Sequence, residues 1–463
     1  MPNLTPLPVM LLYSFLKFIL KVALRVFFRR FEVHGREKLR NTKGPLLLVS
    51  NHPNTFMDPL IAATLMPQRL AFIANGSIFT KFTRPFFKFF HVIPVYRQKD
   101  TSDVPLSPAE LNKMTFKRCY DYLKAKGSIL IFPEGTSEIE RRLRGIKTGT
   151  ARIALGAEYE NNFQLGITIL PIGLNYSDPT HFRSEVFVNV GEPISVSDFK
   201  EKYNPDSFET VEELTQLIQQ RLAETVIITE DEEEDTLVRQ VETLYKNQLF
   251  DDLHLNDNVK KDEYELIKQL VSAVRYFEKH HPEQLKSLQV KMTNYLENLQ
   301  KLHLSDEIFT QTRRLYSHLG TTLLKLIVGF PFYTWGLFTN YVPYISPSKI
   351  ANLISSDVTY RAPIMMTVGI IAFPVFYGLD IWAMQTAFQN SWLTLAFAVS
   401  LPLTGYFVLW YWDKVTRLSH LWQALRLFRQ KPTLMESLTT ERTKIFNLLE
   451  EAKTIYLKRE FAQ

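Results

Sequence analysis

Residues 46–60 read LLLVSNHPNTFMDPL. The apolar run at the start of this stretch is bounded by Pro45 and Ser50, a pattern that predicts a short buried strand. The strand places His52 and Asp58 just beyond its C-terminal end. Open α/β sheets keep their chemistry at that edge. The stretch therefore predicts an α/β sheet with a candidate site at the end of this strand.

His52 and Asp58 are six positions apart. On one regular helix, six positions correspond to about 600°, which puts the two side chains on different faces. The segment between them must bend, and Pro53 and Asn54 suit a bend, while Asp58-Pro59 predicts a helix N-cap followed by proline at the first helical position. Two interpretations remain open. In one, Asp58 orients the imidazole while His52 removes a proton from an attacking hydroxyl; in the other, the residues form only a capped helix after a turn.

The composition indicates a membrane-associated protein with a substantial core. The chain has 463 residues, enough for two or three domains, and 46% of them are hydrophobic and 13% aromatic. A net charge of +6 suits an anionic bilayer surface or anionic substrates, and no nucleic-acid module accompanies it. Cys119 is the only cysteine, so one chain holds no disulfide. It lies in a helical pattern over residues 108–125, and we expect an unreactive core thiol.

The N-terminal segment, residues 1–30, predicts an amphipathic interfacial helix. Its apolar stretch, residues 9–28, is interrupted by Lys17, Lys21 and Arg25, and Arg29 continues this row at a spacing of four. A spanning helix would have to desolvate three cations, at about 2.5–3.5 kcal/mol each. A helix lying in the interface avoids that cost. The alternative is an amphipathic helix packed on a soluble core.

Residues 31–225 alternate short apolar strands with helix-length segments, which predicts an α/β domain with a mostly parallel or mixed sheet and helices on both faces. The expected strands are residues 46–49, 70–74, 92–96, 128–132, 168–174 and 186–190. Residues 79–90 carry six phenylalanines among three cations. This segment is compatible with an acyl-chain pocket, a bilayer contact or core packing.

Two further strands end in polar residues. The strand at residues 92–96 is followed by Arg97, whose planar guanidinium can hold a phosphate in a bidentate manner. The strand at residues 128–132 leads into Glu134-Gly135, where the glycine permits close backbone approach to a ligand and the buried charge requires partners. The hydroxyls of Thr136 and Ser137 follow. A basic cluster then comprises Arg141, Arg142, Arg144 and Lys147, which suits either a phosphate or a solvated face.

These motifs, in this order, resemble the PlsC-like phospholipid and glycerol-phosphate acyltransferases, also called lysophospholipid acyltransferases. The resemblance covers residues 31–194 and rests on Asn51-His52 with Asp58, on residues 93–97, on residues 132–137, and on Leu170-Pro171-Ile172-Gly173. One departure is the spacing, since five residues separate His52 from Asp58 where the family usually has four. The longer spacing is similar to the branch of glycerol-3-phosphate and dihydroxyacetone-phosphate acyltransferases.

The resemblance implies a role for each matching residue. His52 would be the general base, Asp58 would orient it, and Arg97 together with Glu134-Gly135 would bind the phosphate of the acceptor. Lys147 resembles the basic turn that follows the third motif. The remaining expected substrate-binding residues are Thr136 and Ser137.

The second half of the chain lies outside the resemblance. An acidic run at residues 230–235 predicts a solvated linker, and residues 236–315 predict a helical hairpin broken near His280-His281-Pro282. Three apolar stretches follow, at residues 319–344, 363–388 and 392–412. Basic flanks precede the first and follow the last, so two crossings joined by the uncharged turn at 389–391 would keep both flanks cytoplasmic. The first stretch, interrupted by prolines, would be re-entrant or interfacial.

The sequence thus predicts five segments. They are an interfacial helix (1–30), an acyltransferase domain (31–225), an acidic linker with a helical hairpin (226–315), a membrane region with a re-entrant segment and two spans (316–412), and a basic cytoplasmic helical tail (413–463).

The leading hypothesis is a membrane-bound enzyme with its catalytic domain on the cytoplasmic face. It would transfer a fatty acyl group from acyl-CoA or acyl carrier protein to glycerol 3-phosphate or 1-acyl-glycerol 3-phosphate, with no cofactor, no metal ion and no nucleic-acid partner. A phospholipid transacylase would need the same His–Asp pair. A catalytically inactive membrane-anchored binding protein is disfavoured because the His, Asp, Arg and Glu of the motifs are all present. No G-x-S-x-G occurs, which disfavours an α/β-hydrolase.

Overall fold

The predicted strand is β2 (Leu46–Ser50), which lies inside a mixed sheet. The computed structural model describes residues 7–42, 44–96, 107–206, 208–256, 259–310 and 312–460. All five β2 side chains are buried, and successive side chains point to opposite faces of a sheet, so both faces of β2 are covered. β2 pairs in parallel with β5 (Ser128–Ile131) on one side and with β6 (Thr168–Tyr176) on the other.

In the described part of the chain the sheet has eight strands, in the order β1-β7-β6-β2-β5-β3-β4, with β8 pairing with β6. β4, β3, β5, β2 and β6 run parallel to one another, while β7 and β8 are antiparallel to β6. The C-terminal ends of those five strands therefore share one edge. The other strands are β1 (Arg30–His34), β3 (Leu70–Asn75), β4 (Val92–Val95), β7 (Glu185–Val190) and β8 (Ile194–Ser195). The six predicted strands are confirmed within two residues.

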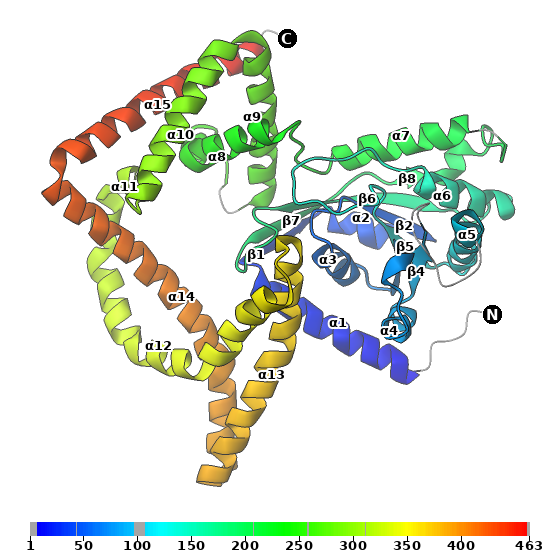
Figure 1. The fold of residues 1–463 in the computed structure, drawn as a ribbon, viewed down its shortest axis with the longest axis horizontal. Coiled ribbons are helices and arrows are strands. Elements are labelled where there is room, and N and C mark those ends of the chain that lie inside the picture. Colours follow the sequence, from blue (N-terminus) through cyan, green and yellow to red (C-terminus); the bar gives the residue numbers. More distant parts are fainter. Residues whose placement is uncertain are drawn as a thin grey trace. The chain divides into compact units, whose positions relative to one another are not determined.

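Helices cover both faces of the sheet (Figure 1). Leu47 and Val49 of β2 belong to one core cluster with residues of α5 (Pro108–Lys124), α6 (Gly149–Glu160) and α7 (Glu209–Ala223). Elsewhere in this domain α1 (Leu7–Phe27) contacts α3 (Met57–Leu65), and α2 (Arg36–Asn41) contacts β7. Short elements complete the domain: η1 (Gly76–Ile78), α4 (Arg84–Phe89) and η2 (Val196–Phe199). The predicted fold class, a mixed sheet with helices on both faces, is confirmed.

The helix α5 illustrates how the local sequence sets an element. Ser107 accepts a hydrogen bond from the Glu110 backbone while the Glu110 side chain accepts one from the Ser107 backbone, and Pro108 occupies the first helical position. Cys119 is fully buried on this helix, and burial raises the pKa of its thiol to about 12. The predicted core thiol is confirmed.

The row of cations predicted along the N-terminal helix is only partly exposed on α1. Leu24 and Phe27 are buried, and Lys17 is half-buried, with its ammonium hydrogen-bonded to the Met66 carbonyl. Burial lowers the pKa of Lys17 to about 8. Lys17 is therefore not part of an exposed row of cations. The exposed side carries large apolar residues alongside Lys21 and Arg25; these apolar residues are Met10, Leu11, Leu12, Phe15, Phe18 and Val22.

The chain divides into two compact units. The first runs to Ile228 and includes Ile350–Thr367; the second comprises Thr229–Lys349 and the residues from Val368 onward. In the second unit, α8 (Glu232–Asp252), α9 (Lys260–His280) and α10 (Pro282–Lys301) contact one another, and α15 (Pro432–Glu460) packs on α10. The predicted helical hairpin is therefore wrong, because the segment forms three long helices and the short α11 (Glu307–Thr310). The break at His280-His281-Pro282 is confirmed.

The acidic run is not a linker, because it forms the N-terminus of α8. Asp231 caps the helix by accepting a hydrogen bond from the Glu234 backbone at 2.8 Å. Glu234 is buried and accepts from Arg275 Nε at 2.7 Å. Carboxylates stabilise the positive end of a helix dipole, which explains why a run of acids begins a helix here.

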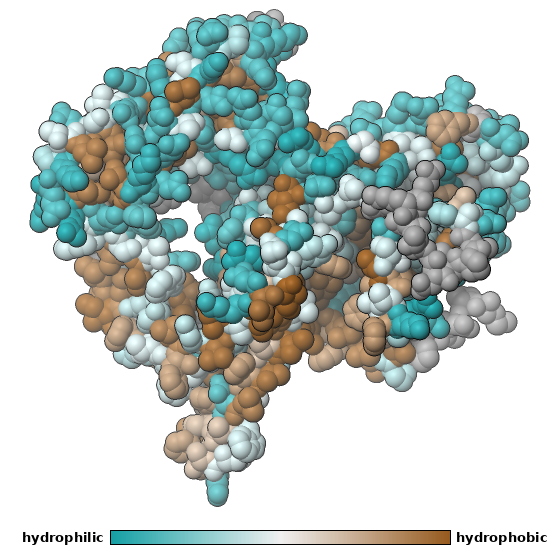
Figure 2. Space-filling view, in the orientation of Figure 1, coloured by the Kyte–Doolittle hydropathy of each residue, from teal (hydrophilic) through white to brown (hydrophobic). Residues whose placement is uncertain are grey.

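Three described helices are long and apolar enough to cross a membrane: α12 (Thr312–Ile354), α13 (Arg361–Phe388) and α14 (Ser391–Gln430). Figure 2 shows hydrophobic residues over much of these helices and hydrophilic ones over α8, α9, α10 and α15. The stretch predicted to be re-entrant or interfacial forms part of one continuous, curved helix that passes through Pro331, Pro343 and Pro347 (Figure 1). Neighbouring helices and polar side chains tolerate such prolines. The short η3 (Val358–Tyr360) joins α12 to α13.

Polar and small residues join the three apolar helices. Tyr377 of α13 donates to Asn340 Oδ1 of α12 at 2.5 Å, and Asn340 Nδ2 donates to the Leu401 carbonyl of α14 at 3.3 Å. A Cβ on Gly336 would meet the Thr404 carbonyl at 2.7 Å, so the glycine permits close approach of α12 and α14. This is the small-residue and hydrogen-bonded packing that membrane helices favour.

Candidate active site

The structure brings His52 and Asp58 together at the shared edge of the parallel strands. His52 Nδ1 lies 2.8 Å from Asp58 Oδ2, and Asp58 is fully buried while the His52 side chain is 15% exposed. The hydrogen bond to a carboxylate places the proton on Nδ1, so the Nε2 lone pair is available to accept another proton. No hydrogen bond of Nε2 occurs among the described residues. The catalytic interpretation of the pair is thus sterically and electrostatically feasible.

Asp58 does not have the capping role predicted for it. The helix α3 begins at Met57 with Phe56 at the N-cap position, so Asp58 lies inside the first turn. Its carboxylate accepts from the Asn54 backbone at 2.7 Å and from the Tyr176 hydroxyl at 2.6 Å, in addition to His52. Complete burial raises the pKa of the Asp58 carboxyl, and these three donors oppose the rise. Asp58 therefore fixes both the loop at Asn54 and the imidazole of His52.

Tyr176 is a site residue that sequence reasoning missed. It is the last residue of β6, the strand next to β2, and its side chain is buried against Asp58. Burial and the neighbouring carboxylate raise its pKa well above the usual value, so it remains a hydrogen-bond donor. The sequence signal was only its place at the end of the strand that carries Leu170-Pro171-Ile172-Gly173, 118 residues from Asp58 in the chain.

A second missed residue is Phe132, which supports the face of the imidazole. The two rings are stacked with centroids 3.9 Å apart and planes inclined by 10°. Phe132 directly follows β5, the other neighbour of β2. Asn51 is fixed in a comparable way, because its side chain both donates to and accepts from the Leu174 backbone of β6. The imidazole and its loop are thus positioned from both adjacent strands.

Glu134 joins the histidine loop to the loop that follows β5. One carboxylate oxygen accepts from the His52 backbone at 3.1 Å, and the other accepts from the Arg144 backbone at 3.1 Å. Burial raises the pKa of Glu134, while these hydrogen bonds and the charge of Arg144 oppose the rise. The partners that its buried charge requires are therefore backbone amides. Among the described contacts, both oxygens of its carboxylate bind backbone amides of the protein itself.

Gly135 and Lys147 lie next to each other. Gly135 has a φ of +70°, and a Cβ added to it would lie 2.5 Å from Lys147 Nζ. The Lys147 backbone donates to the Pro133 carbonyl at 2.9 Å, so the two segments run side by side. No ion pair of Lys147 occurs in the described ranges. Its ammonium is therefore available for an anion at this edge.

Gly135→Ala is expected to destabilise the protein by about 1–2 kcal/mol, because an L-residue in the left-handed region is strained, and to displace Lys147 Nζ. Thermal unfolding in detergent measures the first effect. Gly145→Ala is the matched control, since Gly145 lies in the same loop, has no left-handed φ, and would place an added Cβ with no other atom within 4 Å. Equal unfolding temperatures for the two variants would contradict the strained role of Gly135.

The other predicted residues divide into three groups. Ser137 is tied to the histidine loop, since Thr55 Oγ1 lies 3.2 Å from its hydroxyl, and Thr136 is half-buried beside it. Arg142 and Arg144 pair with Glu140 at 3.2 and 2.7 Å, so the basic cluster is not a set of unpaired cations. Arg97 lies outside the described residues.

The strand β4 precedes Arg97 in the sequence. β4 ends at Val95, two residues earlier, and is the third strand from β2 across β5 and β3. At about 4.8 Å per strand this separation is roughly 14 Å.

His52, Asp58 and Glu134 lie in a segment that is similar to known proteins. A family of acyltransferases, described simply as "Acyltransferase", matches residues 30–175. Glycerol-3-phosphate O-acyltransferase 2 of Saccharomyces cerevisiae is 38% identical over 108 residues, which are 23% of this chain and 14% of that protein. Glycerol-3-phosphate O-acyltransferase 1 of the same yeast is 32% identical over 136 residues, 29% of this chain and 18% of that one.

Two further similarities come from a plant and a bacterium. The chloroplastic 1-acyl-sn-glycerol-3-phosphate acyltransferase LPAT1 of Arabidopsis thaliana is 27% identical over 151 residues, 32% of this chain and 36% of that protein. The crystal structure of the 1-acyl-sn-glycerophosphate acyltransferase PlsC from Thermotoga maritima is 18% identical, with a TM-score of 0.31, and the match covers 45% of this chain and 78% of that one.

The His–Asp pair and most strands of the sheet lie in the segment, residues 30–175, that matches the acyltransferase family. By these similarities, residues 30–175 resemble the PlsC-like glycerol-phosphate and lysophosphatidate acyltransferases. The match spans less than a fifth of the length of the two yeast proteins. The helices from α8 onward lie outside residues 30–175, the segment that matches the acyltransferase family.

Proposed function

We propose that the protein transfers a fatty acyl group from an acyl thioester, acyl-CoA or acyl carrier protein, to a hydroxyl of glycerol 3-phosphate or 1-acyl-glycerol 3-phosphate. The observation that carries the proposal is the His52–Asp58 pair at 2.8 Å, with Nε2 facing no partner in the described residues. The names of the yeast and plant relatives support the acceptor class.

The chemistry requires little more than positioning and proton transfer. His52 Nε2 accepts the proton of the acceptor hydroxyl as the oxygen attacks the thioester carbonyl. The carbon–sulfur bond then breaks, and the departing thiolate takes the proton back from the imidazolium. Asp58 stabilises that imidazolium, as in other His–carboxylate pairs. A thioester is already activated, so a covalent acyl-enzyme is not part of the proposal.

The acceptor phosphate is assigned to Arg97 and Lys147, with Glu134 acting through the loops it holds and Gly135 giving room for Lys147. Thr136 and Ser137 supply hydroxyls beside this site.

Arg97→Ala is expected to raise the apparent KM for the phosphorylated acceptor by about tenfold or more, because one charge-assisted bidentate contact is lost. The KM for the donor is expected to change much less.

The test is a steady-state assay in nanodiscs that compares glycerol 3-phosphate, dihydroxyacetone phosphate, 1-acyl-glycerol 3-phosphate and glycerol as acceptors. Arg36→Ala, an exposed arginine at the start of α2, is the control. Turnover of glycerol without its phosphate at a comparable kcat/KM, or an Arg97→Ala defect confined to the donor KM, would overturn the phosphate assignment.

We also propose that the protein is membrane-bound with the acyltransferase domain on the cytoplasmic face. The apolar exposed side of α1 suits a membrane interface. The rings of Phe82 and Phe86 suit it too, since both are exposed and so are not packed in the core. α13 and α14 are the better candidates for full crossings, since α12 has the lowest mean hydropathy of the three and three internal prolines.

A further inference from the structure

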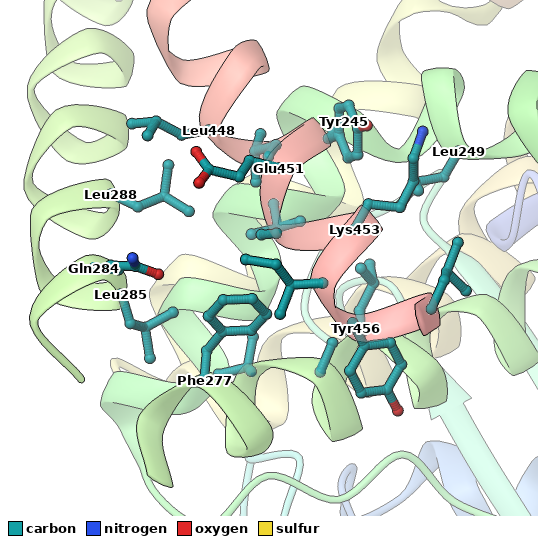
Figure 3. A pocket seen from close by; sticks show the side chains of 18 of the residues that line it. Tyr245, Leu249, Phe277, Gln284, Leu285, Leu288, Leu448, Glu451, Lys453 and Tyr456 are labelled. Atoms are coloured by element: carbon teal, nitrogen blue, oxygen red, sulfur yellow. The ribbon is translucent and has the colours of Figure 1, made fainter. Parts of the chain in front are cut away.

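The second unit contains a cavity of about 370 Å³ between α8, α9, α10 and α15. Figure 3 shows its walls: Phe277 from α9, Leu285 and Leu288 from α10, and Leu448 from α15 surround the space. No residue of the cavity lies within the segment that matches the acyltransferase family. The cavity is therefore a feature separate from the candidate active site.

The deep walls of the cavity are apolar. Leu249 of α8, Val274 and Phe277 of α9, and Leu288 of α10 are at least nine-tenths buried and line it without contributing a polar atom. Tyr245 lies at the wall but points its hydroxyl at Glu450, with which it forms a hydrogen bond. Cavities with such walls do not hold water well and take apolar ligands instead.

The rim of the cavity carries carboxylates that have no partner. Glu283 of α10 and Glu451 of α15 line the cavity and are exposed, and neither has a hydrogen-bond or ion-pair partner in the part of the chain that the structure describes. Lys453 does not offset them, because its ammonium already pairs with Asp252 and Glu450 at 2.6 Å each. The rim therefore disfavours an anionic head group.

The cavity has room for an acyl chain. One water-sized group needs about 10–15 Å³ of such space, so the cavity of about 370 Å³ accommodates a chain of methylene groups. A chain with three helices suited to a bilayer would also have membrane lipids next to it.

We propose that this cavity binds one acyl chain of a lipid whose head group carries no net negative charge, with monoacylglycerol as the simplest case. The chain would lie along the apolar walls between α9 and α15, and the head group would lie at the Glu283–Glu451 rim. Free fatty acids, lysophosphatidate and acyl-CoA fit less well, because their anionic heads meet the two carboxylates.

The test uses the full-length protein in nanodiscs and a monoacylglycerol with a photoactivatable diazirine in its acyl chain. Peptide mapping by mass spectrometry is expected to find the label on α8, α9, α10 or α15, and excess unlabelled monoacylglycerol should compete it away. Ala273→Phe and Ala452→Phe fill the cavity from α9 and α15 and should each lower the labelling at least about fivefold.

Ser272→Phe is the matched control, since Ser272 is the exposed neighbour of Ala273 and does not line the cavity. Its labelling should equal that of the unaltered protein. Label confined to α12, α13 and α14, or label on the four cavity helices that unlabelled monoacylglycerol does not displace, would overturn the proposal. A lysophosphatidate probe with the same chain that labels equally well would overturn the assignment of the head group.

Discussion

His52→Ala is expected to lower the rate of acyl transfer at least about 10²-fold, the usual contribution of a general base. The side chain lies at the edge of the sheet, stacked on Phe132 and partly exposed, so its removal leaves the buried core of β2 intact. The measurement is product formation by purified protein in nanodiscs, with thermal unfolding as the check on folding.

The chain offers a matched control for this substitution. His181 Nδ1 lies 2.8 Å from Asp178 Oδ2, a second His–Asp pair of the same length, but on an exposed loop after β6. His181→Ala removes a comparable interaction and should leave the rate within about twofold, as expected for a surface ion pair. Similar losses in both variants would mean that the His52 effect is not specific to a base at the sheet edge.

Asp58→Asn is expected to cause a comparable loss in kcat, at least about 10²-fold, with little change in either KM. The amide preserves the shape of the carboxylate, but its NH₂ group favours the imidazole tautomer that carries the proton on Nε2, where no proton can be accepted. The expected split between kcat and KM separates this orienting role from a general loss of structure.

Tyr176→Phe is the graded comparison for Asp58→Asn. It removes one of the three donors to Asp58 and keeps the carboxylate, so its loss in kcat should be clearly smaller than that of Asp58→Asn. A Tyr176→Phe variant that is as impaired as Asp58→Asn would indicate that the hydroxyl itself acts in the reaction, and the orienting role of Asp58 would have to be revised.

The local part of the site was predictable from the sequence, and the non-local part was not. A strand followed by a turn and a helix places His52 and Asp58 within one short segment, so their pairing follows from six residues of chain. The contact of Tyr176 with Asp58 depends on β6 pairing with β2, and the stacking of Phe132 depends on β5 lying on the other side. The spacing of residues within one motif does not reveal which strands lie beside β2.

The errors outside the site have a common physical origin. The acidic run looked like a solvated linker, because sequence charge alone does not reveal that Arg275, 41 residues away, pairs with Glu234. Prolines in α12 suggested a broken segment, whereas packing by Asn340 and Gly336 accompanies a continuous helix. In both cases tertiary partners overrode a local preference.

Transfer of a labelled acyl group most directly tests the central claim, that the His52–Asp58 pair catalyses acylation of a glycerol-phosphate acceptor. Protein in nanodiscs would receive glycerol 3-phosphate or 1-acyl-glycerol 3-phosphate together with a radiolabelled acyl group carried by CoA, by acyl carrier protein or by a phospholipid. We predict label in the acylated acceptor from a thioester donor with the unaltered protein, and none above background with His52→Ala. Label that arises only from the phospholipid, as a transacylase would give, or no label from any donor with folded protein, as an inactive binding protein would give, would contradict the account.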